Sequence, residues 1–370
     1  MQFRIQRIEL LNALSKVSKA VSSKSPLPVL TGIKFEIIDG RLILTGSDSD
    51  ITIQTIIEEK ENILEIVKEG AVVLSSRFIS EIIRKIDSEF VTFDIIDGSL
   101  TKITGDNSEF NLNGIKSIDY PKIDLNKTGE NFKINSVLLK NVIDQTIFAT
   151  SDKEARPTLT GVNFKSSVDT IECTATDSYR LAKKYIDVED NLVFNITIPG
   201  KSLNEISKII EKDEVIDIYI TDRKILFVLD NVFIQTRLID GTFPDTSRLI
   251  PTSYDYELNA DSRELLSAID RASLLTSESA NIVKLTMDKE NVTISSSSQE
   301  IGSVEEHLTS AIYEGEPLSI SFSAKYLTDA IRAIGSNKIT IFFTGQMKPF
   351  VVKNKSDLSI IQLVLPVRTY

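Results

Sequence analysis

The chain has 370 residues, 41% of them hydrophobic and 26% charged, and a formal net charge of −11 at pH 7. This length predicts two or three globular domains. One cysteine, Cys173, and one histidine, His307, exclude an internal disulfide and argue against catalytic triads and most zinc sites. No apolar run approaches the ~18 residues of a membrane span, and the first residues do not resemble a secretory signal, so we expect a cytoplasmic protein.

The first predicted element is a short alternating strand that starts at Phe3 and runs into an amphipathic helix, in FRIQRIELLNALSKVSKAV. The same strand-and-helix pattern recurs from Phe132, in FKINSVLLKNVIDQTIFAT, and from Tyr256, in YELNADSRELLSAIDRASLL. The copies stand about 125 residues apart, which is the sign of an internal repeat.

A second strand-and-helix pattern has the same period. It starts at Val73 in VLSSRFISEIIRKI, at Thr197 in TIPGKSLNEISKII and at Ser321 in SFSAKYLTDAIRAI. Two independent patterns with one period predict three homologous domains. We place them at residues 1–127, 128–253 and 254–370.

Two of these helices carry sequence signals for their first turn. Ser202 with Glu205, and Asp261 with Glu264, have the capping-box spacing, in which two side chains satisfy the free backbone N–H groups of a helix start. We therefore expect the helices to begin at these residues.

The rest of each repeat is rich in β-branched and aromatic residues and predicts strands. Asp-Gly pairs, which favour turns, separate these strands at Asp39–Gly40, Asp97–Gly98 and Asp240–Gly241. The predicted fold class is α+β, with two helices per domain packed on largely antiparallel sheets.

Charge is divided unevenly between the helices and the remaining sequence. The six predicted helices together carry slightly more basic than acidic residues, so the acidic excess lies outside them. One interpretation is chance variation on solvated helix faces. The other is a mildly basic helical surface that meets a polyanion weakly and without sequence readout.

A short motif occurs in two of the repeats. TGSDS ends at Ser49 and TATDS ends at Ser178, and we expect Asp48 and Asp177 to bind their own backbone in a turn. After the motif the copies differ, with DITI in the first and YRLA in the second. YRLA lacks the acid–base partner of a catalytic site and the glycines of a phosphate loop, which leaves a recognition surface. A hydrolase using Asp48 and Asp50 is a further hypothesis, although no third metal ligand accompanies them.

The three repeats, TATDSYRLA, LIDGTFPD followed by Arg248, and the final LVLPVRTY together resemble the bacterial DNA polymerase III β subunit family, the sliding clamps. The resemblance covers the whole chain. It implies a head-to-tail homodimer that closes a ring around duplex DNA, performs no catalysis and needs no cofactor or metal. It also implies three kinds of partner: a clamp loader, the replicative DNA polymerase, and other proteins with a clamp-binding motif.

The same resemblance implies a groove for partner peptides, in the middle domain and at its junction with the last. Arg180 and Arg248 would border it and donate to peptide carbonyls. The implied groove residues are Leu159, Thr176, Ser178, Tyr179, Arg180, Leu181, Pro244, Arg248, Leu249, Tyr326, Met347, Leu363, Val364, Leu365, Pro366, Val367 and Arg368. Tyr179 and Ala280 depart from the family pattern, so the peptide preference stays open.

Two more residue sets follow from the resemblance. The implied DNA contacts are Lys24, Arg77, Lys153, Arg156 and Lys201, with solvated surface charge as the alternative for each. The implied dimer interface sets Phe110 and Leu112 against Leu274 and Leu275, with negative charge from Glu300, Glu305 and Glu306.

Asp106 and Glu109 stand beside Phe110 where family members often have basic residues, so we expect apolar packing to dominate that interface. The main rival hypothesis is a repeat scaffold that binds partner peptides without encircling DNA.

Overall fold

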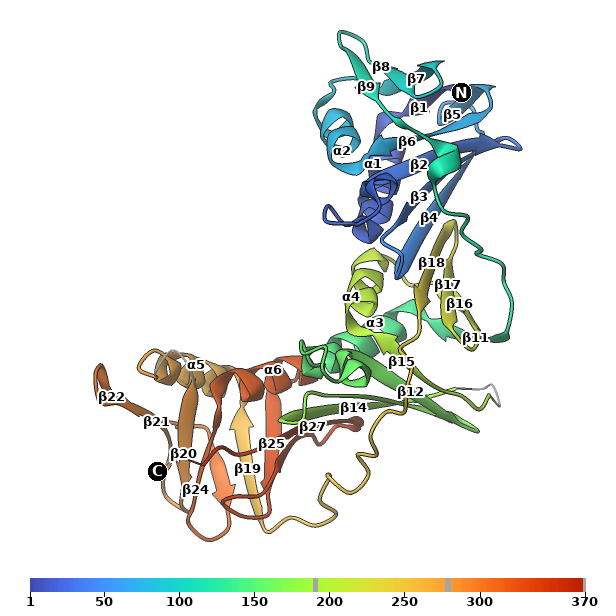
Figure 1. Ribbon diagram of the computed structural model, residues 1–370. Helices are drawn as coiled ribbons and strands as arrows, with labels where there is room; N and C mark the ends of the chain where they lie inside the picture. The colour runs from blue at the N-terminus through green and yellow to red at the C-terminus, as the bar shows by residue number, and fades with distance from the viewer. Residues whose placement is uncertain (189–191, 277–280, 369–370) are drawn as a thin grey trace. The chain divides into compact units, whose positions relative to one another are not determined.

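The computed structural model describes residues 1–188, 192–276 and 281–368 (Figure 1). These residues form two compact units. The first comprises Met1–Leu139 and Asn204–Leu238, and the second comprises Lys140–Leu203 and Ile239–Tyr370. In the described ranges no helix is long and apolar enough to cross a membrane.

The first repeated pattern forms a strand that passes directly into a helix, as predicted. The three copies are β1 (Gln2–Gln6) with α1 (Arg7–Val17), β11 (Glu130–Asn135) with α3 (Ser136–Thr146), and β19 (Tyr256–Asp261) with α5 (Ser262–Ser273). The apolar stripe of α1 is buried at Leu10, Leu14 and Val17, because these positions share one helix face.

The second repeated pattern also forms a strand followed directly by a helix in all three copies. The copies are β6 (Gly70–Ser75) with α2 (Ser76–Lys85), β15 (Asn195–Pro199) with α4 (Gly200–Ile209), and β24 (Leu318–Ser323) with α6 (Ala324–Ile334). Each third of the chain therefore contributes two helices among the described residues.

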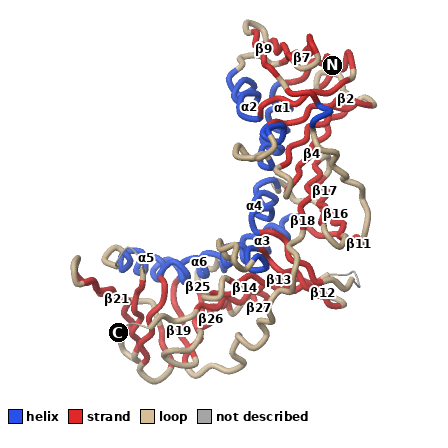
Figure 2. The backbone as a smooth tube through the Cα atoms, in the orientation of Figure 1, coloured by secondary structure: helices blue, strands red, loops and turns tan. Residues whose placement is uncertain are grey.

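The first unit contains two antiparallel sheets. A five-stranded sheet has the order β5 (Leu64–Lys68), β1, β7 (Phe90–Asp97), β8 (Leu100–Thr104), β9 (Glu109–Asn113). A nine-stranded sheet has the order β10 (Ile115–Lys116), β6, β2 (Gly32–Ile38), β3 (Arg41–Ser47), β4 (Ile51–Glu58), β18 (Val232–Arg237), β17 (Lys224–Leu229), β16 (Val215–Ile220), β11. In the larger sheet, β4 of the first repeat pairs with β18 of the second (Figure 2).

The second unit repeats this arrangement. Its nine-stranded sheet has the order β15, β12 (Gly161–Ser167), β13 (Thr170–Thr176), β14 (Arg180–Asp187), β27 (Asp357–Val364), β26 (Phe350–Asn354), β25 (Lys338–Phe343), β19, β23 (Ile312–Glu314). Its four-stranded sheet has the order β22 (Gly302–His307), β21 (Val292–Ser298), β20 (Ile282–Met287), β24. Here β14 of the second repeat pairs with β27 of the third.

The strand orders make the three repeats equivalent. Strands β4, β14 and β22 hold the same place, next to the hairpin partners β3, β13 and β21. Strands β9, β18 and β27 hold another common place, next to β8, β17 and β26. The fold is therefore the predicted α+β architecture of three homologous domains. The exact domain boundaries stay predictions.

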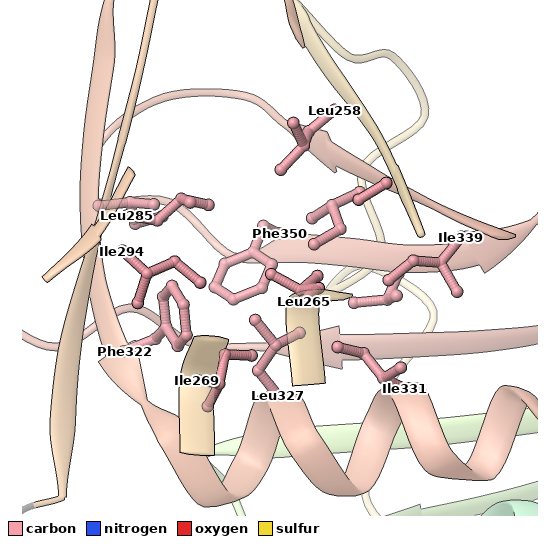
Figure 3. Packing of buried hydrophobic residues seen from close by; sticks show 14 of the residues in the cluster. Leu258, Leu265, Ile269, Leu285, Ile294, Phe322, Leu327, Ile331, Ile339 and Phe350 are labelled. Carbon is pink, nitrogen blue, oxygen red and sulfur yellow. The ribbon is translucent and has the colours of Figure 1, made fainter. Parts of the chain in front are cut away.

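Apolar side chains of the paired helices fill the core between the sheets. In the third repeat, Leu265 and Ile269 of α5 and Leu327 of α6 pack toward Phe322 and Phe350 (Figure 3). The two phenyl rings meet edge to face with 5.4 Å between their centroids. Burial of each such side chain stabilises the fold by about 1.5–3 kcal/mol.

The predicted turns hold in the first repeat. Asp39 and Gly40 have φ of 51° and 72° in the tight hairpin between β2 and β3, and Gly98 has φ of 61° after β7. Asp240–Gly241 is different, since it lies in the long connection between β18 and β19 rather than in a hairpin.

The predicted helix starts need one correction. Asp261 caps α5 by accepting from the N–H groups of Arg263 and Glu264. Glu264 binds the turn at Thr309 and Ser310. Ser202 is not a cap, because α4 begins two residues earlier, where the pairing of β15 ends at Pro199, and Ser202 is buried within the first helical turn.

Candidate functional site

The turn after β13 is built by the predicted aspartate. The Asp177 Oδ1 accepts from the N–H groups of Tyr179 at 2.9 Å and Arg180 at 3.0 Å. In the first repeat, Asp48 does the same for the residues two and three positions on, at 3.0 and 2.9 Å. The prediction that both aspartates bind their own backbone is confirmed, so the motif is part of the repeated fold.

This turn places Tyr179 at the surface. Ser178 has φ of 78°, a left-handed conformation that side chains rarely adopt, and the equivalent Ser49 has φ of 86°. Thr176 is buried, and its Oγ1 donates to the Arg180 carbonyl at 2.6 Å, which closes the turn. The Tyr179 side chain is left 56% exposed.

The Arg180 side chain links the turn to the third repeat. It is buried, its Nε lies 3.0 Å from the Asp177 Oδ2, and its Nη1 lies 2.7 Å from the Asp329 Oδ2 in α6. The guanidinium also stacks 4.6 Å from the centroid of the Tyr326 ring. The family resemblance predicts that Arg180 donates to peptide carbonyls. Instead, these two nitrogens hold the rim of the site together.

The C-terminal segment after β27 runs beside this turn. The Leu365 N–H donates to the Tyr179 carbonyl at 2.9 Å, and the Val367 N–H donates to the Ser321 carbonyl at 2.7 Å. Leu365, Pro366 and Val367 are half-buried. The segment is thus held by both repeats of this unit while part of its apolar surface stays accessible.

The strand register gathers these segments at one end of the nine-stranded sheet. Arg180 lies opposite Val364, and Val364 lies opposite Phe350. The turn that carries Met347 runs from Phe343, the last residue of β25, to Phe350, the first residue of β26. Phe343 in turn lies opposite Tyr256. The Tyr179 turn, the C-terminal segment, the Met347 turn and the end of the long connection therefore share this sheet end, although they are far apart in sequence. We call this surface the sheet-end site.

The predicted groove residues fall into three groups by exposure. Leu159, Thr176, Arg180, Leu181, Leu363 and Val364 are buried. Tyr326, Leu365, Pro366 and Val367 are half-buried. Ser178, Tyr179, Pro244, Arg248, Leu249, Met347 and Arg368 are exposed. Only the last two groups offer surface to a ligand.

The buried group supports the site from below. Leu181 and Leu363 lie opposite each other in the β14–β27 pair and pack on Val351. Ile250 and Tyr254 from the long connection cover this cluster. Ile250, Tyr254 and Asp329 carry no sequence signal for this site, because only tertiary packing brings them beside Arg180, Leu181 and Leu363.

The basic residues expected to meet DNA are all exposed: Lys24, Arg77, Lys153, Arg156 and Lys201. Arg156 has a second feature, since its Nη1 donates to the Ser178 Oγ at 3.1 Å. It therefore borders the sheet-end site as well.

The residues expected at a dimer interface lie on or near two outer strands. Phe110 and Leu112 are half-buried on β9. Leu274 is 73% exposed after α5, and Leu275 is half-buried. Glu300 and Glu305 are exposed.

Glu306 differs from this expectation. Both of its carboxylate oxygens accept from Arg271, at 2.9 and 2.7 Å, so its charge is already paired. On the other strand, Glu109 lies 2.8 Å from Lys102, and Asp106 is exposed. Ala280 lies outside the described residues.

No arrangement for hydrolysis accompanies the paired aspartates. The Asp48 carboxylate is engaged with its own turn. Over residues 1–188, 192–276 and 281–368, no three His, Cys, Asp or Glu side chains are grouped to hold a metal. His307 is exposed and lines a cavity of about 440 Å³ with Lys289 and Tyr313, and none of the predicted groove residues lines this cavity.

Comparison with known proteins matches all three repeats to the domains of one family. Residues 1–124, 133–245 and 247–368 match the models of the N-terminal, central and C-terminal domains of the DNA polymerase III beta subunit. The chain is 44% identical to the beta sliding clamp of Bacillus subtilis and 42% identical to that of Staphylococcus epidermidis, with both chains covered completely in each case. The crystal structure of the Bacillus subtilis DNA polymerase sliding clamp superposes with a TM-score of 0.95 over the full length of both chains.

Proposed function

This chain belongs to the DNA polymerase III beta subunit family, and we propose that it is a sliding clamp that encircles duplex DNA. In this proposal it catalyses no reaction. It acts in the cytoplasm as a ring that tethers the replicative DNA polymerase to its template, and a clamp loader opens the ring.

The repeated sheet junction is the observation that carries the ring. Strand β4 pairs with β18, and β14 pairs with β27, so each repeat joins the next by the same two edges. One edge of each kind is left over, β22 in the third repeat and β9 in the first, and each is the outermost strand of its sheet. A second copy supplies the missing neighbour for both edges, which gives a closed head-to-tail dimer.

The DNA contacts follow from this ring. Six helices of one chain and six of its partner would line the hole. The exposed Lys24, Arg77, Lys153, Arg156 and Lys201 would meet phosphates, which carry no sequence information, so the ring slides. The excess of acidic residues elsewhere on the chain keeps DNA from binding to the outer surface.

The sheet-end site is proposed to bind partner peptides. Exposed Tyr179, Leu249 and Met347 and the half-buried C-terminal segment offer apolar surface, and Arg248 offers a hydrogen-bond donor. An extended peptide with apolar side chains is the ligand such a surface recognises. The polymerase, the loader and other partners would compete for it.

Retention on circular DNA tests the proposal. A loader from the same organism and ATP place the protein on a nicked circular plasmid, free protein is filtered away, and the circle is then cut once. We expect the protein to stay on the circle and to leave after the cut.

Two other results would contradict the ring. Retention after the cut would mean that the protein grips DNA directly. A chain that binds partner peptides but is never retained would be a repeat scaffold, the rival hypothesis.

A further inference from the structure

The two sheet junctions within the chain predict how a third is paired. In the first junction Ile53 of β4 lies opposite Ile234 of β18. Ile53 stands two residues after Ile51, whose carbonyl accepts from Asp48 and closes the β3–β4 hairpin. Ile234 stands two residues after Val232, which closes the β17–β18 hairpin opposite Leu229. Each of the two facing residues therefore stands two positions after the residue that closes its hairpin, and this count identifies the equivalent residues in the other repeats.

The same count can be made on the two strands that the repeats leave without a partner. Val304 of β22 stands two residues after Gly302, which closes its hairpin opposite Ser298. Phe110 of β9 stands two residues after Ser108, whose carbonyl accepts from the Gly105 N–H at 2.9 Å. Val304 and Phe110 are thus the counterparts of Ile53 and Ile234, and both are half-buried and face the core.

We propose that β9 of one copy pairs with β22 of another in the register of the β4–β18 junction, so that Phe110 faces Val304 and Glu109 faces Glu305. The inference rests on the proposed ring in that a second copy supplies the partner edge. Because two acidic residues then lie directly opposite each other, charge repulsion weakens the seam of this ring.

The neighbouring charges offset this repulsion only in part. Lys102 lies 2.8 Å from Glu109 on the same copy, and one ammonium group does not balance two carboxylates. His307 lies 3.6 Å from Glu305 and is charged only when protonated, and Arg271 is engaged with Glu306. Glu109, Glu305 and Lys102 lie on the outer face, where salt screens the repulsion and the attraction alike.

The second junction has the same register. Its positions are matched through neighbouring strands, because β27 has an irregular register with β26 near their hairpin. Gln362 lies opposite Val352 of β26, as Ile234 lies opposite Phe227 of β17. Ala182 lies opposite Ala175, two residues before Asp177, as Ile53 lies opposite Gly46, two residues before Asp48. Ala182 and Gln362 pair with each other, so both junctions support the register that sets Phe110 against Val304.

Cysteine cross-linking separates this register from one that is shifted by two residues. In the proposed register Asn111 faces Ser303, and in a register shifted by two residues it would face Ile301; all three are exposed. The native Cys173 is buried and does not interfere. In full-length dimer under mild oxidation, the pair Asn111→Cys with Ser303→Cys should give a covalent dimer, and Asn111→Cys with Ile301→Cys should give little.

Dimer dissociation constants test the repulsion. Glu109→Gln and Glu305→Gln should each tighten the dimer roughly three- to tenfold, since like charges opposite each other destabilise strand pairs and the ring has two seams. Raising the NaCl concentration should tighten the native dimer more than the variants. Glu300→Gln, an exposed acid of the same repeat outside the pair, is the control and should change the constant less than twofold.

The outcomes are distinct. A chain that stays monomeric by sedimentation at every concentration contradicts the ring itself. A dimer that cross-links through Ile301, or through neither pair, overturns the register. A dimer that cross-links through Ser303 but loosens in Glu109→Gln overturns the repulsion.

Discussion

Asp48 and Asp177 occupy equivalent turns in two repeats, but Asp177 binds one more group than Asp48. Both hold two backbone N–H groups, and only Asp177 also binds a buried arginine. Sequence alone showed the shared role, because the motif recurs. The added role depends on Arg180, which reaches Asp329 of the third repeat as well.

This difference predicts the stability of two matched variants. Asp48→Ala should lower the free energy of unfolding by about 1 kcal/mol, as for the loss of a side-chain cap. Asp177→Ala should cost about 2–3 kcal/mol, because it also leaves buried Arg180 with one carboxylate fewer. Urea denaturation measures both. Equal losses would mean that Asp329 alone satisfies Arg180.

At the scale of elements, Glu264 joins the start of α5 to the turn before β23. Burial opposes ionisation of this carboxyl, but hydrogen bonds from Ser310 and Thr309 outweigh it and lower its pKa from 4.5 to about 2. Between these values the unfolded chain binds a proton that the folded chain does not. The contribution to stability is thus complete above pH 4.5 and is lost as the pH falls toward 2.

The matched experiment is acid denaturation of Glu264→Gln. We expect the native protein to lose stability more steeply than the variant as the pH is lowered from about 5 to 3, because the variant has no carboxyl to protonate. Glu290→Gln, at an exposed position in a turn of the same repeat, is the control and should keep the native slope. If Glu264→Gln also keeps that slope, the turn does not hold Glu264 ionised.

If peptides bind at the sheet-end site, substitutions at the two ends of the nine-stranded sheet should change the Kd of a peptide differently. Met347 and Leu358 are both exposed, at 51% and 74%, but only Met347 lies at the end where β14 meets the C-terminal segment. Met347→Asp should raise the Kd of a peptide from the polymerase at least about tenfold, since apolar burial is lost and a charge is desolvated. Leu358→Asp should leave it within about twofold. Fluorescence anisotropy measures both, and equal effects would place the peptide elsewhere.

At the scale of the whole molecule, the ring and the peptide site should be separable. Phe110→Asp puts a charge where the seam needs an apolar side chain, so it should give a monomer by sedimentation and abolish retention on DNA. Peptide binding should persist, because the sheet-end site belongs to the other compact unit. Ile96→Asp, at an exposed apolar position of the same sheet, is the control and should remain a dimer. A dimeric Phe110→Asp would argue that β9 is not at the seam.

Sequence by itself determined the three repeats, the strand that leads into each helix, and the Asp48 and Asp177 turns. These features depend on local periodicity and backbone chemistry, which each segment carries by itself. Resemblance to the family also predicted the residues of a peptide groove, and their role in binding stays a prediction.

Only the tertiary structure decided which of those residues are buried and which partners they bind. Leu181 and Leu363 are apolar, as a groove requires, yet the β14–β27 pairing buries both of them under Ile250 and Tyr254. Arg180 is committed to Asp177 and Asp329, and Glu306 is committed to Arg271. The same residue type can line a surface or support it, and the choice depends on which distant strand lies beside it, which the local sequence does not encode.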